Sequence, residues 1–229
     1  MKKQKQALPH VPRYLYDHCR REWWPALDLH RQIRHFKKGE QIFSEGDPVR
    51  GVYFMIDGVV KVHKHWTDDK ELIIRFATNN DIIGHRGLSS HSDKYPITAT
   101  ALSQVEACYI DMDFFYATLK VNPELMFDLM LFFADELQLS EQRMRDLAHR
   151  SVRSRVAGNL LALEKKFGVD PSGNIAFQIS RQDIAAYTGA AYETVYKLLL
   201  EFEQAGLIRT SGRQIGILQR DALHAASLI

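Results

Sequence analysis

Cysteine is scarce in this sequence, which holds only Cys19 and Cys108 among its 229 residues. Two cysteines so far apart exclude a disulfide framework or a four-cysteine iron–sulfur site within one chain. Long apolar runs are also missing: no stretch approaches the roughly 18 apolar residues of a membrane span, and the basic N-terminus lacks the apolar core of a signal peptide. We therefore expect a protein of the reducing cytoplasm that makes no membrane contact.

Catalytic signatures are missing too, since the sequence contains no nucleophile elbow, phosphate loop, zinc motif or converging carboxylate pair. We predict that the protein is not an enzyme and binds no metal or cofactor. Charge of one sign is not in large excess either, with 30 Lys and Arg against 28 Asp and Glu. Residues 151–229 carry nine Lys and Arg against seven Asp and Glu, so charge alone does not indicate nucleic-acid binding. The more basic residues 1–40 suit either a solubilising surface or an accessory contact with an anionic partner.

Short β-like segments occupy residues 33–110, where apolar and polar positions alternate between clusters of turn residues. This pattern is typical of an antiparallel barrel or sandwich. The dipeptide Asp57-Gly58 predicts a hairpin between two of these strands, because glycine tolerates the positive φ that a tight turn requires.

A long helix is expected after the strands. Residues 113–119 predict a short helix, and Asn122-Pro123 begins the long one, with proline in the first turn where its missing N–H has no cost. Apolar side chains then step by four and three, a heptad spacing interrupted only at Ser140. This seam consists of Met126, Met130, Phe133, Leu137, Ser140, Met144 and Leu147.

A second apolar stripe lies beside the seam and consists of Leu125, Leu129, Phe132 and Leu139. A helix with two apolar faces suits a position between its own barrel and a second subunit, so we predict a homodimer. Burial of both faces within one chain is the alternative.

The polar residues 148–153 suggest a hinge, after which residues 156–167 predict a helix that ends at Gly168. Residues 175–179 (IAFQI) resemble a strand. Ser180 then begins another helix, with Asp183 three residues later in the arrangement of a capping box. Gly189 ends that helix, and a further helix starts after only a few residues, which is helix-turn-helix spacing.

The second helix of this motif has one apolar face, made of Val195, Leu198, Leu199 and Phe202. Tyr192, Glu193, Tyr196 and Lys197 occupy the opposite face. Glutamate accepts a hydrogen bond from cytosine, lysine donates to guanine or phosphate, and tyrosine adds apolar contact with a hydroxyl. An acid on a surface that meets DNA favours base reading over simple electrostatic attachment.

Residues 207–218 predict a hairpin that would form a wing beside the two helices. The predicted DNA-contacting residues are Ser180, Arg181, Gln182, Tyr192, Glu193, Thr194, Tyr196, Lys197 and Arg213. A generic three-helix subdomain for protein contacts is the alternative, and the full succession of helix, turn, helix and hairpin disfavours it.

Nearly the whole chain, from Ile33 to Leu218, resembles the cAMP receptor protein and FNR (Crp/Fnr) family of bacterial regulators. KKGEQIFSEGDPVRGVYFMIDGVVKVH resembles the start of that family's cyclic-nucleotide-type barrel. ISRQDIAAYTGAAYETVYKLLLEFEQAGLI resembles its helix-turn-helix, with Glu193 at the base-reading glutamate and Lys197 where arginine is usual.

The resemblance implies an α+β fold: an N-terminal cyclic-nucleotide-binding-like β-barrel of jelly-roll type, a long dimerisation helix and a C-terminal winged helix-turn-helix. We expect the barrel domain in residues 1–121, the dimerisation helix in 122–150 and the DNA-binding domain in 151–229. The resemblance also implies a homodimer on a two-fold symmetric site in double-stranded DNA, acting through RNA polymerase.

The segment that binds the cyclic phosphate departs from the pattern of the cAMP-binding members, which is G-E-L followed by R-S-A. Here His85 replaces the glutamate and Tyr95 replaces the arginine, while Ser140-Glu141 replaces the Thr-Ser pair that meets the adenine. The candidate effector pocket consists of Gly84, His85, Arg86, Gly87, Tyr95 and Ser140. We expect that it does not bind cAMP, and that it is filled by protein side chains or serves another effector.

Two alternative functions remain at this point. One is a cyclic-nucleotide-binding module whose C-terminal domain contacts protein. The other is a haem-based sensor, because the sequence has ten histidines, among them His63, His65, His85 and His91. Their spacing does not favour haem over ordinary surface histidines.

Overall fold

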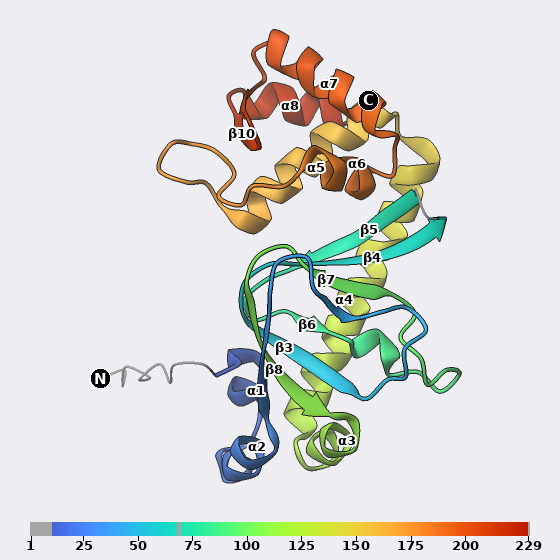
Figure 1. Cartoon of the computed structure of the whole chain (residues 1–229), viewed down its shortest axis with the longest axis vertical. Helices are drawn as coiled ribbons and strands as arrows, with labels where there is room; N and C mark the ends of the chain where they lie inside the picture. Colours follow the sequence, from blue (N-terminus) through green and yellow to red (C-terminus); the bar gives the residue numbers. More distant parts are fainter. Residues whose placement is uncertain (1–10, 68–69, 229) are drawn as a thin grey trace. The chain divides into compact units, whose positions relative to one another are not determined.

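The computed structural model describes residues 11–67 and 70–228 (Figure 1). The chain divides into two compact units. The first holds residues up to Lys64 together with Ile74–Asp135, and the second holds His65–Ile73 and the residues from Glu136 onward. In the described ranges, no helix combines the length and the apolar character needed to cross a bilayer.

Eight strands in the described part of residues 32–111 form two four-stranded sheets. One has the order β1-β8-β3-β6 and the other β2-β7-β4-β5. The strands are β1 (Gln32–Phe36), β2 (Gln41–Phe43), β3 (Gly51–Asp57), β4 (Val60–Thr67), β5 (Lys70–Ala77), β6 (Ile82–Ile83), β7 (Thr98–Ala101) and β8 (Val105–Asp111). This arrangement confirms the expected antiparallel β-domain.

Strand β3 is buried on both faces because each face meets a different apolar layer. Tyr53 and Met55 point into the core between the two sheets. Val52 and Phe54 belong to a second core, beneath the helices that cover the first sheet. Since successive side chains of a strand alternate between faces, a nearly continuous apolar run results.

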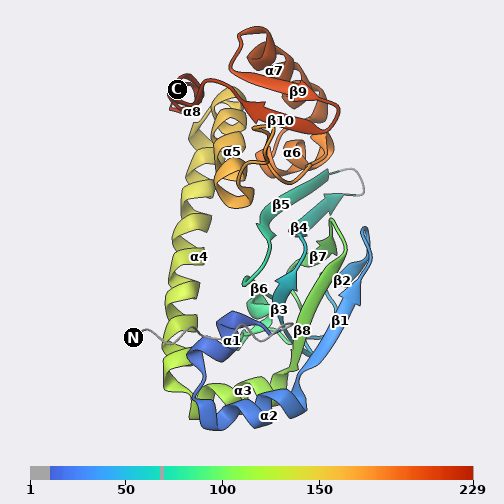
Figure 2. The same cartoon turned by 90° about the vertical axis from the view of Figure 1, so that its left-hand side faces the viewer.

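Helices cover the outer face of the first sheet. They are α1 (Arg13–His18), the 3₁₀ turn η1 (Arg21–Trp23), α2 (Trp24–His30), α3 (Met112–Val121) and the first part of α4 (Pro123–His149). Helices α2 and α3 lie side by side (Figure 2), and the rings of His30 and Phe114 stack at 4.1 Å between centroids. Cys19 and Cys108 are free thiols buried in this layer, and burial raises the pKa of each to about 12.

The prediction of a hairpin at Asp57-Gly58 is wrong. The turn is tight, with φ of 95° at Gly58, but it carries the chain from one sheet to the other. Strand β3 pairs with β8 and β6, whereas β4 pairs with β7 and β5. Both edges of β3 are therefore occupied by strands from elsewhere in the chain, so β4 cannot pair with it.

The C-terminal part of the chain holds helices α5 (Val152–Phe167), α6 (Arg181–Thr188), α7 (Tyr192–Gln204) and α8 (Arg220–Ser227), with the hairpin of β9 (Ile208–Ser211) and β10 (Gln214–Ile217). Helix α5 begins earlier than predicted because Ser151 caps it by accepting from the Ser154 N–H at 3.1 Å. The interruption between α4 and α5 is thus confined to Arg150 and Ser151. This is shorter than the hinge predicted for residues 148–153.

The strand predicted for residues 175–179 does not form. Ile175 makes one isolated bridge with Val169, and its N–H donates to the Ile215 carbonyl at 2.8 Å. The residues after it are irregular.

Candidate nucleic-acid interface and effector pocket

The cap of α6 forms as the sequence predicts. The Ser180 hydroxyl accepts from the Asp183 N–H at 3.0 Å and donates to the Asp183 carboxylate at 2.5 Å. This satisfies one of the exposed donors of the first turn. The reciprocal bond of a full capping box, from the acid to the cap's own N–H, is replaced by the hydroxyl contact.

The turn between α6 and α7 requires glycine. Gly189 has φ of 66°, and a Cβ at this position would lie 2.8 Å from the Leu147 side chain. The carbonyls at the end of α6 receive arginine donors: Arg155 reaches the Thr188 oxygen at 2.6 Å and Arg143 reaches the Tyr187 oxygen at 2.8 Å. These contacts fix the turn against α5 and the C-terminal part of α4.

Helix α7 has one buried face and one exposed face, as the periodicity predicts. Val195, Leu199 and Phe202 are buried, and Leu198 is half-buried. The exposed face carries Tyr192, Glu193, Thr194, Tyr196 and Lys197. The rings of Tyr192 and Tyr196 stack, with centroids 5.9 Å apart, so the two tyrosines form one aromatic surface beside the charged pair.

The wing is held to both helices of the motif. The Glu203 carboxylate accepts from the Thr210 N–H and hydroxyl, each at 2.7 Å, which joins α7 to β9. Arg181 donates to the Gly212 carbonyl at 3.2 Å at the tip of the wing, and burial lowers its pKa from the ordinary arginine value. Arg213 and Gln182 are exposed, whereas Ser180 is half-buried by its role as the cap.

The seam along α4 is exposed over most of its length. Met126, Met130, Leu137, Met144 and Leu147 are between 42% and 63% exposed. Ser140 is exposed as well, and Phe133 is half-buried. Of the second stripe, Leu125 and Leu129 are buried, Phe132 is half-buried and Leu139 is exposed.

Tyr95 fills the interior of the barrel. Its ring is only 4% exposed and stacks on Phe43 with centroids 4.1 Å apart. Its hydroxyl donates to the Gly51 carbonyl at 2.7 Å, and burial raises its pKa to about 12. A Cβ on Gly84 would lie 3.4 Å from the same ring. The hydroxyl that stands in place of the arginine is thus already bound to the protein.

His85 is also buried, in the 3₁₀ turn η2 (His85–Gly87). Its ring meets Phe132 and Phe133 of α4 edge-on, with centroids 4.9 and 5.4 Å away. Burial, followed by the nearby positive charges of Arg75 and Arg86, holds its pKa well below the ordinary value. A neutral, aromatic-packed histidine therefore occupies the position of the glutamate.

The remaining candidate pocket residues are Gly87, Arg86 and Ser140, and each has a different environment. Gly87 packs against Val49, since a Cβ there would lie 2.6 Å from that side chain, and Arg86 is half-buried. Ser140 is an exposed residue of α4 in the second unit. The structure therefore brings Gly84 and Tyr95 into contact, beside the turn that holds His85, Arg86 and Gly87.

Two family models match the chain: the cyclic nucleotide-binding domain over residues 33–122 and the Crp-like helix-turn-helix domain over residues 154–226. The chain is 28% identical over 200 residues to the CRP-like cAMP-activated global transcriptional regulator of Mycobacterium tuberculosis, covering 86% of this chain and 89% of that one. It is also 28% identical over 200 residues to the transcriptional activator protein FnrA of Stutzerimonas stutzeri, covering 86% and 81%.

The solved structure of FixK2 from Bradyrhizobium japonicum is similar as well. It matches with a TM-score of 0.76 and 26% identity, covering 86% of this chain and 96% of that one. The similarity thus extends over barrel, long helix and winged helix together.

Proposed function

Because this chain belongs to the Crp/Fnr family of transcription regulators, which are not enzymes, and carries that family's DNA-binding helix-turn-helix, we propose that it acts as a homodimer on a two-fold symmetric DNA site. The observation that carries the proposal is the exposed face of α7, where Glu193 and Lys197 lie one helical turn apart beside two stacked tyrosines. Glu193 and Lys197 would contact bases or phosphates in the major groove.

The α4 seam supports the homodimer. Five large apolar side chains at heptad spacing are exposed along it, as expected for a helix that pairs with a second copy. The C-terminal part of α4 lies in the same unit as the winged helix, and Arg143 joins it to the end of α6. Pairing of two α4 helices would therefore set the distance between two α7 helices.

We assign the parts of the chain accordingly. Residues 1–121 would form the sensor domain, 122–150 the dimerisation helix and 151–229 the DNA-binding domain. A regulator of this kind acts on transcription in the cytoplasm through RNA polymerase. The name of the Stutzerimonas relative, a transcriptional activator, supports that mode of action.

The effector of this protein is not cAMP in our proposal, although the Mycobacterium relative is named as cAMP-activated. A cyclic phosphate buried in a barrel needs a cation and fixed donors to replace its hydration. Tyr95 supplies neither, since its hydroxyl is bound to Gly51 and its ring occupies the interior. Calorimetric titration should give no cAMP binding at micromolar concentrations, and micromolar affinity would contradict the assignment.

Selection of binding sites from random DNA with the purified full-length protein tests the proposal. We expect a two-fold symmetric consensus with half-sites about 10 bp apart, centre to centre. A consensus with a single half-site would contradict the homodimeric mode, and no enrichment of any sequence would contradict DNA reading.

A further inference from the structure

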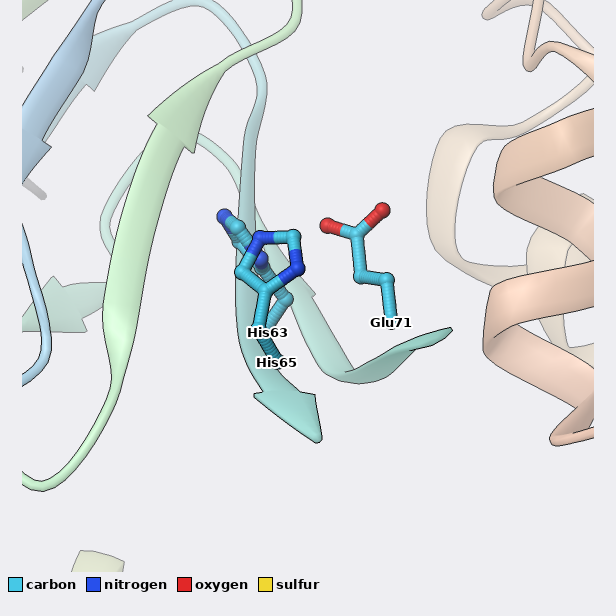
Figure 3. A group of neighbouring side chains, drawn as sticks. All are labelled: His63, His65 and Glu71. Atoms are coloured by element: carbon cyan, nitrogen blue, oxygen red, sulfur yellow. The ribbon is translucent and has the colours of Figure 1, made fainter. Parts of the chain in front are cut away.

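Three side chains with metal-binding chemistry come together on the neighbouring strands β4 and β5. His63 and His65 lie two residues apart on β4, so they share a face of the strand. Glu71 lies on the neighbouring strand β5, and its carboxylate faces the two imidazoles (Figure 3). The sequence alone does not single out this glutamate, because residues 66–70 separate it from the histidines.

The spacing of the three groups suits a shared ion. One ligand atom from each of His63, His65 and Glu71 lies within 4.8 Å of the other two. Ligand atoms around a tetrahedral zinc ion, at about 2.0–2.2 Å from the metal, are about 3.3 Å apart. Rotation of the exposed His65 and the half-buried Glu71 would have to close this difference when an ion binds.

His63 is anchored as a metal-ligating histidine usually is. It is 2% exposed, and its Nε2 lies 2.8 Å from the Thr100 hydroxyl on β7. When Nε2 donates its proton to Thr100, Nδ1 carries the lone pair that a metal requires. Such a bond from the second ring nitrogen fixes the tautomer and the orientation of a ligating imidazole.

We propose that His63, His65 and Glu71 bind one divalent transition-metal ion of the zinc class. Two imidazoles and a carboxylate favour zinc, cobalt, nickel or ferrous iron over magnesium and calcium, which prefer oxygen ligands. Three protein ligands leave a fourth position for water or another donor. This site goes beyond the proposed function, and it differs from our expectation from the sequence of a protein without metal.

The test uses the untagged, metal-free full-length protein. Calorimetric titration with Zn²⁺ should give one ion per chain, and Co²⁺ should produce the visible absorption of a low-symmetry nitrogen and oxygen site. Loss of a residue that hydrogen-bonds to a metal ligand weakens binding by roughly 10- to 100-fold. His65→Ala and Glu71→Gln, which change ligands themselves, should each weaken Zn²⁺ binding by more than this. Thr100→Val, which removes the hydroxyl that is bonded to His63, should weaken Zn²⁺ binding within that roughly 10- to 100-fold range.

The exposed His91 lies outside the group and provides the matched control, so His91→Ala should bind Zn²⁺ as the parent does. Thermal unfolding without metal verifies that each variant is folded; the changes at His65 and Glu71 affect side chains that are not fully buried. Absence of micromolar Zn²⁺ binding, or unchanged affinity in both the His65 and the Glu71 variant, would overturn the proposal.

Discussion

Replacement of Tyr95 tests whether the barrel interior is closed to an effector by its own side chains. Tyr95→Phe keeps the stacked ring and removes the donor to Gly51, whose carbonyl then stays buried without that bond, at a cost of about 1–3 kcal/mol. Tyr95→Ala also removes the packing on Phe43 and leaves a cavity, so the free energy of unfolding should fall by about 3–5 kcal/mol. Urea denaturation measures both values.

Tyr116→Ala is the control for that experiment, because Tyr116 is an exposed tyrosine of α3. Its replacement should change the free energy of unfolding by less than about 1 kcal/mol. If Tyr95→Ala were as stable as the Tyr116 variant, the ring would not fill the interior, and the argument against a bound cyclic nucleotide would fail with it.

Three further predictions concern the cap of α6, the buried histidine and the seam. Ser180→Ala should lower the free energy of unfolding by about 0.5–2 kcal/mol in urea denaturation, because the first turn of α6 loses its acceptor. Burial lowers the pKa of His85 in the folded protein, whereas in the unfolded chain this histidine takes up a proton near pH 6.5. The free energy of unfolding should therefore fall as the pH drops below that value, and His85→Gln should flatten this pH dependence of stability. The double variant Leu137→Asp, Met144→Asp should give monomers in sedimentation, since two unpaired charges in the seam cost several kcal/mol. As the control, Gln138→Asp adds a charge at an exposed position about 100° around the helix from Leu137, and it should leave the dimer intact.

The two faces of α7 follow from the sequence because periodicity decides them locally. Val195 and Phe202 recur at helical spacing and are buried, while Glu193 and Lys197 are exposed. The turn at Gly189 is similarly local, since its positive φ needs glycine. A few neighbouring residues determine such features, so they can be predicted from the sequence.

Other features depend on contacts between distant residues. The N-terminal helices α1 and α2 were not predicted, because they are short. The turn between them, η1, is held by a tertiary bond from Trp23 to Thr118 at 3.1 Å. The turn at Gly58 was recognised, but the pairing of β3 is decided by β8 and β6. The substitution at Tyr95 predicted a poor cAMP site, whereas its stacking on Phe43 required the fold.

The most direct test of the central claim compares the binding of the parent, Glu193→Ala and Gln204→Ala to the selected DNA site and to its single-base variants. Gln204 is exposed at the far end of α7 and serves as the matched control. We predict that Glu193→Ala loses about 1–3 kcal/mol of discrimination at one base pair in each half-site, while Gln204→Ala discriminates as the parent does. Unchanged discrimination in the Glu193 variant, at every position of the site, would contradict the claim that this face of α7 reads DNA.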